Sequence, residues 1–94
     1  MASNSSKGVA LITGSAQGIG RGIAVRLAAD GFDIALNDLP SNKEKLEECE
    51  QLVKKSGRRV ITVYGDVSKE EDVKAFIQKT VDELGGLDVV IRHT

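Results

Sequence analysis

The sequence is poor in the side chains on which several classes of protein depend. Its 94 residues include no tryptophan, one tyrosine, two phenylalanines, one histidine and one cysteine. So few aromatic rings cannot form a base-stacking platform for nucleic acid, and one cysteine with one histidine gives no thiolate or imidazole cluster for a metal. A formal net charge of −1 provides no basic field for nucleic acid or an anionic membrane. We therefore predict no nucleic acid, membrane or metal among its partners.

What the sequence does contain is typical of one folded domain. Hydrophobic residues make up 40% and charged residues 29%, a balance typical of globular chains. The polar residues 1–7 predict a disordered tail, and residues 8–94 predict a single domain. The lone Cys49 lies on the apolar face of an expected helix and is interpreted as a packed thiol. A reduced thiol and the lack of an apolar leader in the tail favour a cytoplasmic location.

Three glycines follow the first apolar segment. Residues 9–13 are typical of a buried parallel strand, and Gly14, Gly18 and Gly20 come next. The first glycine lets the chain turn sharply out of the strand, and the other two keep side chains away where a ligand and the sheet approach the backbone. A helix begins at this turn, and its free N–H groups and positive dipole end are suited to a pyrophosphate. The alternative is a strand-to-helix turn that binds no ligand.

Strand patterns and amphipathic helix patterns alternate along the chain. Such alternation predicts an α/β fold, a doubly wound parallel sheet with helices on its faces. With right-handed crossovers and the strand order 3-2-1-4, the first two helices cover one face and the third covers the other. The ligand crevice is then expected at the carboxyl ends of strands 1 and 4, where the glycine turn lies. The predicted strands are 9–13, 32–38, 59–64 and 87–91, and the helices are expected to begin near residues 18, 41 and 68.

The first helix carries specific expectations about burial. Ile19, Ile23 and Leu27 recur at every fourth residue, which predicts that all three lie on its buried face. Arg21 and Arg26 are expected to point outward into solvent.

Two serines are placed to begin the later helices. Ser41 is followed three residues later by Glu44, and Ser68 by Glu71. Each pair fits a capping box, in which the serine hydroxyl and the glutamate side chain satisfy free N–H groups at the helix start.

The stretch from Thr13 to Gly20 reads Thr-Gly-x-x-x-Gly-Ile-Gly and resembles the cofactor motif of the short-chain dehydrogenase/reductase family. The resemblance continues to about Ile91, and it implies a Rossmann-like fold that binds a nicotinamide dinucleotide. It also implies which residues contact the cofactor: Gly14, Ser15, Gln17, Gly18, Ile19, Gly20, Asp38, Asp66 and Val67.

Asp38 lies at the end of the predicted second strand, eighteen residues after Gly20. A carboxylate there can accept hydrogen bonds from both hydroxyls of an adenosine ribose and repels a 2′-phosphate. Neither Leu39 nor the glycine turn offers a basic side chain that would compensate such a phosphate. The sequence therefore favours NAD over NADP as the cofactor. The alternative is a simple strand-end carboxylate.

Asp66 and Val67 follow the predicted third strand and match the Asp-Val pair that lines the adenine in the family. A carboxylate can accept a hydrogen bond from the adenine amino group, and an apolar neighbour can flank the ring. Gly-Asp is also ordinary turn chemistry before a helix, so a purely structural role is the alternative.

The chain departs from the family pattern in its last residues and in its catalytic groups. The family reads Asn-Asn-Ala-Gly after the fourth strand, whereas this sequence ends Arg92-His93-Thr94. The family's catalytic Tyr-x-x-x-Lys is absent, because the only tyrosine, Tyr64, is followed four residues later by Ser68. No catalytic residue is therefore assigned, and His93 is interpreted as part of a disordered tail.

These observations predict the NAD-binding portion of a short-chain oxidoreductase that transfers hydride between NAD(H) and an alcohol or carbonyl compound. Two alternatives remain. One is a non-catalytic nucleotide-binding module, and the other is a truncated gene product without activity of its own. The family also implies that strand 87–91 is flanked by a further strand, so this chain is expected to expose an apolar edge through which it can self-associate.

Overall fold

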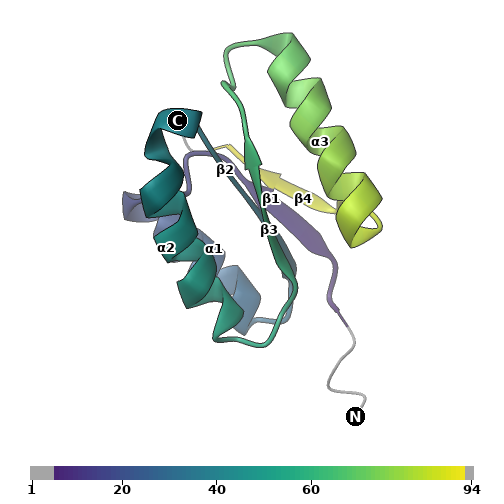
Figure 1. The fold of residues 1–94 in the computed structure, drawn as a ribbon. Helices are drawn as coiled ribbons and strands as arrows, with labels where there is room; N and C mark the ends of the chain where they lie inside the picture. Colours follow the sequence, from purple (N-terminus) through teal and green to yellow (C-terminus); the bar gives the residue numbers. More distant parts are fainter. Residues whose placement is uncertain (1–5, 93–94) are drawn as a thin grey trace.

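The computed structural model describes residues 6–92. The observed order of strands and helices is the predicted alternation, and the chain can be followed from purple to yellow in Figure 1. The elements are β1 (Val9–Ile12), α1 (Gly18–Ala29), β2 (Asp33–Asp38), a short 3₁₀ helix (Pro40–Asn42), α2 (Lys43–Lys54), β3 (Val60–Tyr64), α3 (Glu70–Leu84) and β4 (Val89–Ile91).

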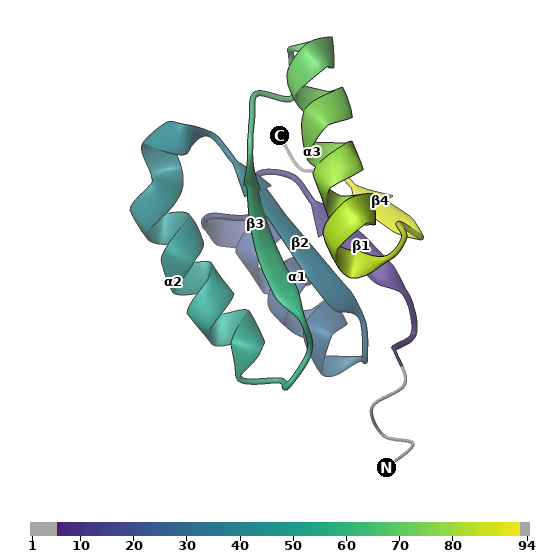
Figure 2. The same cartoon turned by 45° about the vertical axis from the view of Figure 1, so that its right-hand side comes forward.

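The four strands form one sheet in the order β3-β2-β1-β4, and every pairing is parallel (Figure 2). The predicted order 3-2-1-4 is confirmed. β1 lies between β2 and β4, so the glycine turn that follows β1 opens at the point where the chain order reverses. In doubly wound sheets this switch point, at the carboxyl ends of the strands, is where ligands bind.

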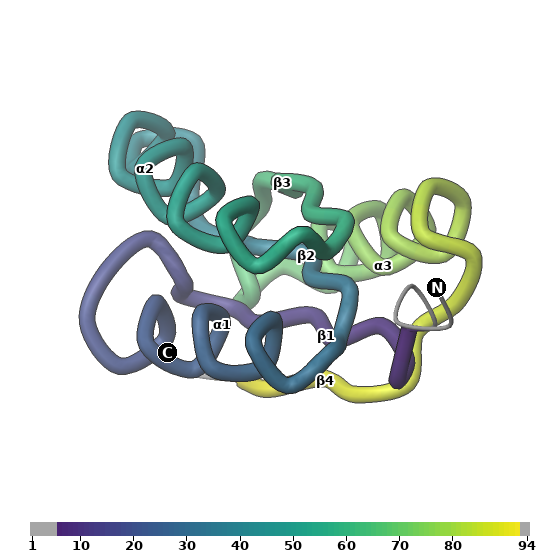
Figure 3. The backbone as a smooth tube through the Cα atoms, turned by 90° about the horizontal axis from the view of Figure 1, so that it is seen from below, coloured from purple at the N-terminus to yellow at the C-terminus, as the bar shows by residue number. Residues whose placement is uncertain are grey.

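The helices form a layer on each side of the sheet. Figure 3 shows α1 and α2 together on one side and α3 on the other, as right-handed crossovers require for this strand order. Side chains along β1 alternate between the two layers, because successive residues of a strand point to opposite faces. Ala10 and Ile12 join the core beneath α1 and α2, whereas Val9 and Leu11 join the core beneath α3.

Neither predicted capping box forms. The chain makes a 3₁₀ turn at Pro40–Asn42 before α2, so Asn42 and not Ser41 is the residue at the helix start, and it makes no side-chain cap. The helix α3 likewise begins after Lys69 without a side-chain cap. The Ser68 hydroxyl donates instead to Asp66 Oδ1 at 2.7 Å. Both predictions failed because the local pattern carried no information on the turns that precede each helix.

The expected burial of Ile19 is also wrong. Its side chain is 67% exposed, whereas Ala24 and Ala28 are buried and Ile23 and Leu27 pack at the edge of the core. Ile19 lies in the first turn of α1, directly after the uncapped helix start, whereas Ile23 and Leu27 lie in the turns that follow. The recurrence of apolar residues at every fourth position therefore did not distinguish the first turn of the helix from the turns that pack against the sheet.

A buried carboxylate that the sequence patterns did not single out lies at the amino end of β2. Asp33, whose side chain is 1% exposed, pairs with Arg58 and Arg59, with one N–O distance of 3.0 Å to each. Burial by itself raises the pKa of Asp33, but the hydrogen bonds from Arg59 and Arg58 outweigh it and hold the pKa below its ordinary value. Arg59 also donates to the carbonyl of Leu84 at 3.0 Å. The network therefore joins the start of β2 and the approach to β3 with the end of α3.

The expected tail is shorter than residues 1–7. The Lys7 N–H donates to the Gly31 carbonyl at 2.9 Å, so Lys7 belongs to the folded part of the chain. The rest of that expectation, for residues 1–5, and the interpretation of His93 lie outside the described residues.

Candidate nucleotide-binding site

The glycine turn has the backbone geometry for which glycine is required. Gly14 and Gly18 have φ values of +64° and +65°, in the left-handed region that other residues rarely adopt. Gly20 is needed for a different reason, because a Cβ atom there would overlap the carbonyl oxygen of Gly14. A Cβ atom at Gly18 would meet no atom within 4 Å. The turn is thus tightly packed on its protein side at Gly20 and open at Gly18.

Ser15 fastens this turn to the neighbouring strand. It is fully buried, and its N–H donates to the Asn37 carbonyl at 3.0 Å. Its hydroxyl donates to that same carbonyl at 3.2 Å and accepts from the Asn37 N–H at 3.1 Å. The side-chain amide of Asn37 in turn donates to the Val63 carbonyl at 3.1 Å. The Ser15 hydroxyl is therefore used within the protein, where it positions the turn across β2.

The N-terminus of α1 faces outward without a side-chain cap. Gln17 is the residue before the helix, and it makes no capping hydrogen bond. Within residues 6–92 no acceptor is recorded for the N–H groups of Gln17, Gly18 and Ile19. The Gln17 Oε1 atom accepts instead from Lys45 Nζ at 2.8 Å. Free N–H donors at a positive helix end and a nearby ammonium group together favour a negatively charged ligand.

Asp38 lies beside this turn and already binds it. Its Oδ2 atom accepts from the Ala16 N–H at 3.1 Å. Its Oδ1 atom accepts from the Leu39 N–H and from the Asn42 side-chain amide, each at 2.8 Å. Since each carboxylate oxygen accepts about two hydrogen bonds, Oδ2 retains room for one more donor. Oδ1 can accept a hydrogen bond from a ligand only if the Asn42 amide or the Leu39 N–H gives up its own hydrogen bond to this atom.

Asp38 and the two predicted adenine-lining residues share one cavity. It has a volume of about 210 Å³ and is lined by Gly14, Asn37, Asp38, Leu39, Gly65, Asp66 and Val67. Asp66 Oδ1 accepts from the Ser68 hydroxyl and N–H at 2.7 and 2.9 Å, and these hydrogen bonds hold the pKa of Asp66 below its ordinary value. No partner within the described chain is recorded for its Oδ2 atom. The fold has therefore brought together residues that lie far apart in the sequence.

Arg21 is the residue of this region that the sequence analysis misjudged. Arg21 was expected to point into solvent, but only 26% of its side chain is exposed. It donates to the Ala16 carbonyl from Nε at 3.0 Å and from Nη2 at 2.6 Å. Its Nη2 atom also reaches the Lys45 carbonyl at 3.0 Å and Glu48 at 3.5 Å. Arg26, by contrast, is exposed as expected. The sequence signal that could have separated the two arginines is their distance from the glycine turn, because Arg21 directly follows Gly20 and Arg26 lies six residues after it.

Cys49 is a residue of α2 and is fully buried. Burial raises the pKa of its thiol, and the charge of Arg21 opposes that rise. The expected packed thiol is confirmed.

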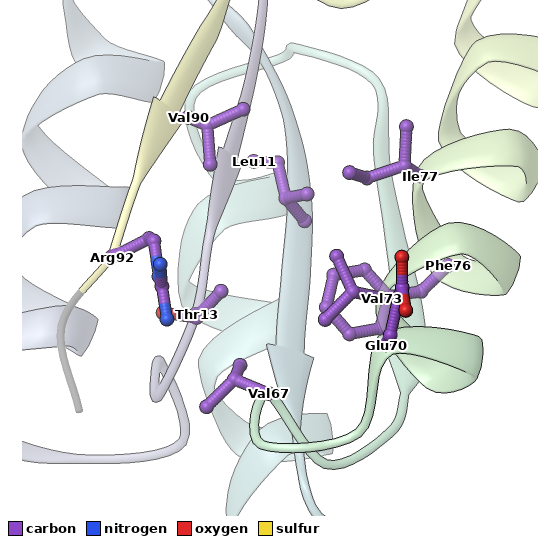
Figure 4. A pocket seen from close by; sticks show the side chains of 9 residues that line it. All are labelled: Leu11, Thr13, Val67, Glu70, Val73, Phe76, Ile77, Val90 and Arg92. Atoms are coloured by element: carbon purple, nitrogen blue, oxygen red, sulfur yellow. The ribbon is translucent and has the colours of Figure 1, made fainter.

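A second, more apolar cavity adjoins the first at Val67. Its volume is about 300 Å³. Figure 4 shows Phe76 and Ile77 on the α3 side facing Leu11 and Val90 on the sheet side. Glu70 lies on the helix wall and Arg92 on the opposite wall beside Thr13 (Figure 4).

Two structural features are absent from residues 6–92. This part of the chain holds no group of three or more histidine, cysteine or carboxylate side chains arranged to bind a metal ion. None of its helices combines the length and apolarity needed to cross a membrane.

The fold is a Rossmann-like α/β domain with a parallel four-stranded sheet, and comparisons with known proteins identify its family. The family model described as short chain dehydrogenase matches residues 8–94. The sequence is 54% identical over 91 residues to the short-chain dehydrogenase/reductase eriH of Hericium erinaceus, covering 95% of this chain and 36% of that protein. It is 42% identical over 85 residues to L-2,3-butanediol dehydrogenase of Corynebacterium glutamicum, covering 90% and 33%. The chain belongs to the short-chain dehydrogenase/reductase family.

Solved structures show the same likeness in three dimensions. The crystal structure of carveol dehydrogenase from Mycobacterium avium in complex with NAD superposes with a TM-score of 0.83 at 38% sequence identity. The match covers 93% of this chain and 35% of that one. The chain thus spans about a third of the length of the relatives that it matches.

Proposed function

We propose that this chain is the NAD-binding portion of a short-chain oxidoreductase that transfers hydride between NAD(H) and an alcohol or carbonyl compound. The observation that carries the proposal is the uncapped start of α1, open at Gly18 and flanked by the carboxylate of Asp38. Family membership supports a nicotinamide dinucleotide as the ligand, and the relative whose structure contains NAD supports this particular dinucleotide.

The residues present fit such a cofactor. Gly18 and Gly20 together give a cradle that is open on the ligand side and closed on the protein side. The N–H groups of Gln17, Gly18 and Ile19 would hold the pyrophosphate, with the helix dipole behind them. The exposed Ile19 side chain would then cover part of the bound dinucleotide. Ser15 would act indirectly, by holding the turn in place.

The neighbouring cavity suits the adenosine half of the dinucleotide. Asp38 Oδ2 would accept a hydrogen bond from one ribose hydroxyl, and Oδ1 would accept a second after Asn42 turns away. Asp66 Oδ2 would accept from the adenine amino group, and Val67 would flank the ring. When bound, the nicotinamide supplies hydride transfer, and the residues described here bind and orient the cofactor for it.

The carboxylate of Asp38 also favours NAD over NADP. A 2′-phosphate would lie close to this negative charge, and the mutual repulsion would weaken NADP binding. Lys45 Nζ, 2.8 Å from Gln17 Oε1, is a cation that folding brings to the turn and that the sequence analysis did not place there. It would offset part of this repulsion, so we expect a preference and not an absolute exclusion. Titration calorimetry with both cofactors tests this, and equal affinities would contradict the role given to Asp38.

The decisive experiment compares two glycines that share a positive φ. Gly18 and Gly57, with φ of +65° and +84°, both have open space where a Cβ atom would lie. Alanine at either position should strain the backbone by about 1 kcal/mol. Only Gly18→Ala places a methyl group in the proposed cradle, so it should weaken NAD binding by about tenfold or more, whereas Gly57→Ala should bind as the unmodified chain does. Equal NAD affinity for both variants would refute the proposal.

A second copy of this chain is the partner that we propose for the β4 edge. The strand is shorter than predicted, 89–91, and no strand of the described chain pairs with its outer side. Val90 is 47% exposed there, and the adjoining cavity has Glu70 and Arg92 on opposite walls. Two copies related by a twofold axis could pair their β4 strands and exchange these opposite charges. Light scattering tests this, and a monomer with slowly exchanging amides in β4 would contradict it.

The cytoplasm is the location that we propose for the protein. It is supported by the buried, unpaired thiol of Cys49, since free buried thiols persist in reducing compartments. Localisation of a tagged chain by microscopy would test it.

A further inference from the structure

We propose that Arg21 is a positioning residue for dinucleotide binding, acting through the backbone of Ala16. The inference rests on the proposed function, and it adds a residue to which neither the motif nor the sequence analysis gave a role. Arg21 is the fourth residue of α1, and it contacts the turn that precedes its own helix.

Ala16 is held from two sides. Its N–H donates to Asp38 Oδ2 at 3.1 Å, and its carbonyl accepts from Arg21 Nε and Nη2 at 3.0 and 2.6 Å. Both hydrogen bonds involve a charged group, and such bonds are about twice as strong as neutral ones. Ala16 itself is completely buried, so water does not compete for its carbonyl. The peptide groups on both sides of Ala16 are therefore fixed in orientation.

This orientation determines where the next donor points. The carbonyl of Ala16 and the N–H of Gln17 belong to one planar trans peptide group, in which they point in opposite directions. Because Arg21 holds the carbonyl toward α2, the Gln17 N–H is directed away from α2. That N–H is one of the donors without an acceptor within residues 6–92. Arg21 thus pre-organises a phosphate donor that it does not itself contribute.

The same guanidinium joins the turn to α2. Its Nη2 atom donates to the Lys45 carbonyl at 3.0 Å and lies 3.5 Å from Glu48 Oε1. The Lys45 side chain also contacts the turn, because its ammonium group donates a hydrogen bond to Gln17 Oε1. A planar fork with several donors can satisfy two carbonyls and a carboxylate together, which the compact ammonium group of lysine cannot do. Lysine at position 21 should therefore restore the function only in part.

The test compares two arginines of α1 and two ligands, using the 94-residue chain. Within residues 6–92 the Arg26 side chain pairs only with Asp30, in an exposed contact at 3.3 Å, so Arg26→Ala is the matched control. NAD contains the pyrophosphate that the turn would hold, whereas adenosine lacks it. Arg21→Ala should lose about tenfold in NAD affinity with little change in adenosine affinity, Arg21→Lys should recover part of the loss, and Arg26→Ala should bind both ligands normally. Titration calorimetry measures NAD, and NMR chemical shifts follow the weaker adenosine.

The outcomes separate this inference from the proposed function. If the unmodified chain binds NAD and Arg21→Ala binds it equally well, the inference is overturned and the proposed function stands. Equal proportional losses for NAD and adenosine would also overturn it, because they would show general damage to the fold. If the unmodified chain binds no NAD, the proposed function fails and the inference fails with it. Without ligand, Arg21→Ala should speed exchange of the Ala16 amide, whose N–H is bonded to Asp38 Oδ2, but not of the amides along β1, and unchanged exchange at Ala16 would likewise overturn the inference.

Discussion

Asp33 and Asp38 are the first and last residues of the same strand, β2, and their surroundings are opposite. Asp33 is buried, and both its oxygens are bonded to arginines. Asp38 is half-buried beside a cavity, and its bonds go to two backbone N–H groups and one neutral amide. The amino end of the strand is a closed ionic network, whereas the carboxyl end keeps a charge that no cation of the described chain neutralises.

The difference follows from how parallel sheets are connected. At the carboxyl ends of the strands the chain leaves the sheet on two different faces, because the crossover after β1 leads to α1 on one face and the crossover after β3 leads to α3 on the other, and a crevice remains beside β1. At the amino end of β2, arginines from the segment before β3 close over Asp33. One residue type at two ends of one strand therefore serves stability at one end and is available for binding at the other.

The largest expected effect is on stability and belongs to Asp33. Removing one partner of a buried ion pair leaves the other partners uncompensated, so Asp33→Ala should lower the free energy of unfolding by about 3 kcal/mol or more. Urea denaturation followed by circular dichroism measures this. Asp30→Ala, which removes an exposed pair with Arg26, is the control and should cost less than about 1 kcal/mol. Similar costs for the two variants would contradict the comparison between the two ends of β2.

The ion pairs of Asp33 with Arg58 and Arg59 should also affect how the free energy of unfolding depends on pH. The folded-state pKa of Asp33 lies below its ordinary value of 3.8, so its ionised form stabilises the fold throughout the range above that value. This contribution is lost as the pH falls from 3.8 through the lower folded-state pKa, because the unfolded chain binds the proton first. Urea midpoints should therefore fall in acid, and less steeply for Asp33→Asn. Asp66, whose pKa is also lowered, contributes with the same sign and remains present in both proteins, so an identical slope for the two would contradict the prediction.

The effect of Asp38→Ala should appear in binding more than in stability. Loss of the ribose acceptor should weaken NAD binding by about tenfold. NADP should lose less, because the repulsion of its 2′-phosphate is lost too, so the preference for NAD should shrink. Calorimetry with both cofactors measures this. Asp38→Asn, which keeps an acceptor oxygen but removes the charge, separates the two causes and should reduce the preference while retaining more of the NAD affinity. An unchanged preference in both variants would exclude Asp38 as its source.

The smallest effect should come from Lys45. Its ammonium group lies on the exposed side of the turn, where a charge interaction is worth less than about 1 kcal/mol. Lys45→Ala should weaken NAD binding by about twofold at low salt and NADP binding somewhat more, and both losses should vanish at high salt because exposed charges are screened. Calorimetry at two salt concentrations measures it. A large, salt-independent loss would place Lys45 in direct contact with the ligand.

The site could be predicted in outline because its parts have local sequence signatures. Gly14, Gly18 and Gly20 reveal a turn that only glycine can form, and Asp38 was recognised from its distance after them. Asp33 was missed because nothing in its local sequence distinguishes a buried ion pair from an ordinary polar residue, whereas the only sign of the role of Arg21 was its position directly after Gly20. The burial of Ile19 was predicted wrongly for a related reason, since periodicity gives the face of a helix but not which of its turns are covered.

The sequence by itself determined the order of the elements, the parallel sheet and the place of the turn, because hydrophobic periodicity and glycine chemistry act over short distances along the chain. The right-handed crossover rule then constrained the strand order. Only the tertiary structure decided which charges are neutralised and which backbone groups remain free. Asp33 lies 26 residues from Arg59, and Ala16 lies 22 residues from Asp38. Contacts of that kind depend on how the layers pack, and no local pattern encodes them.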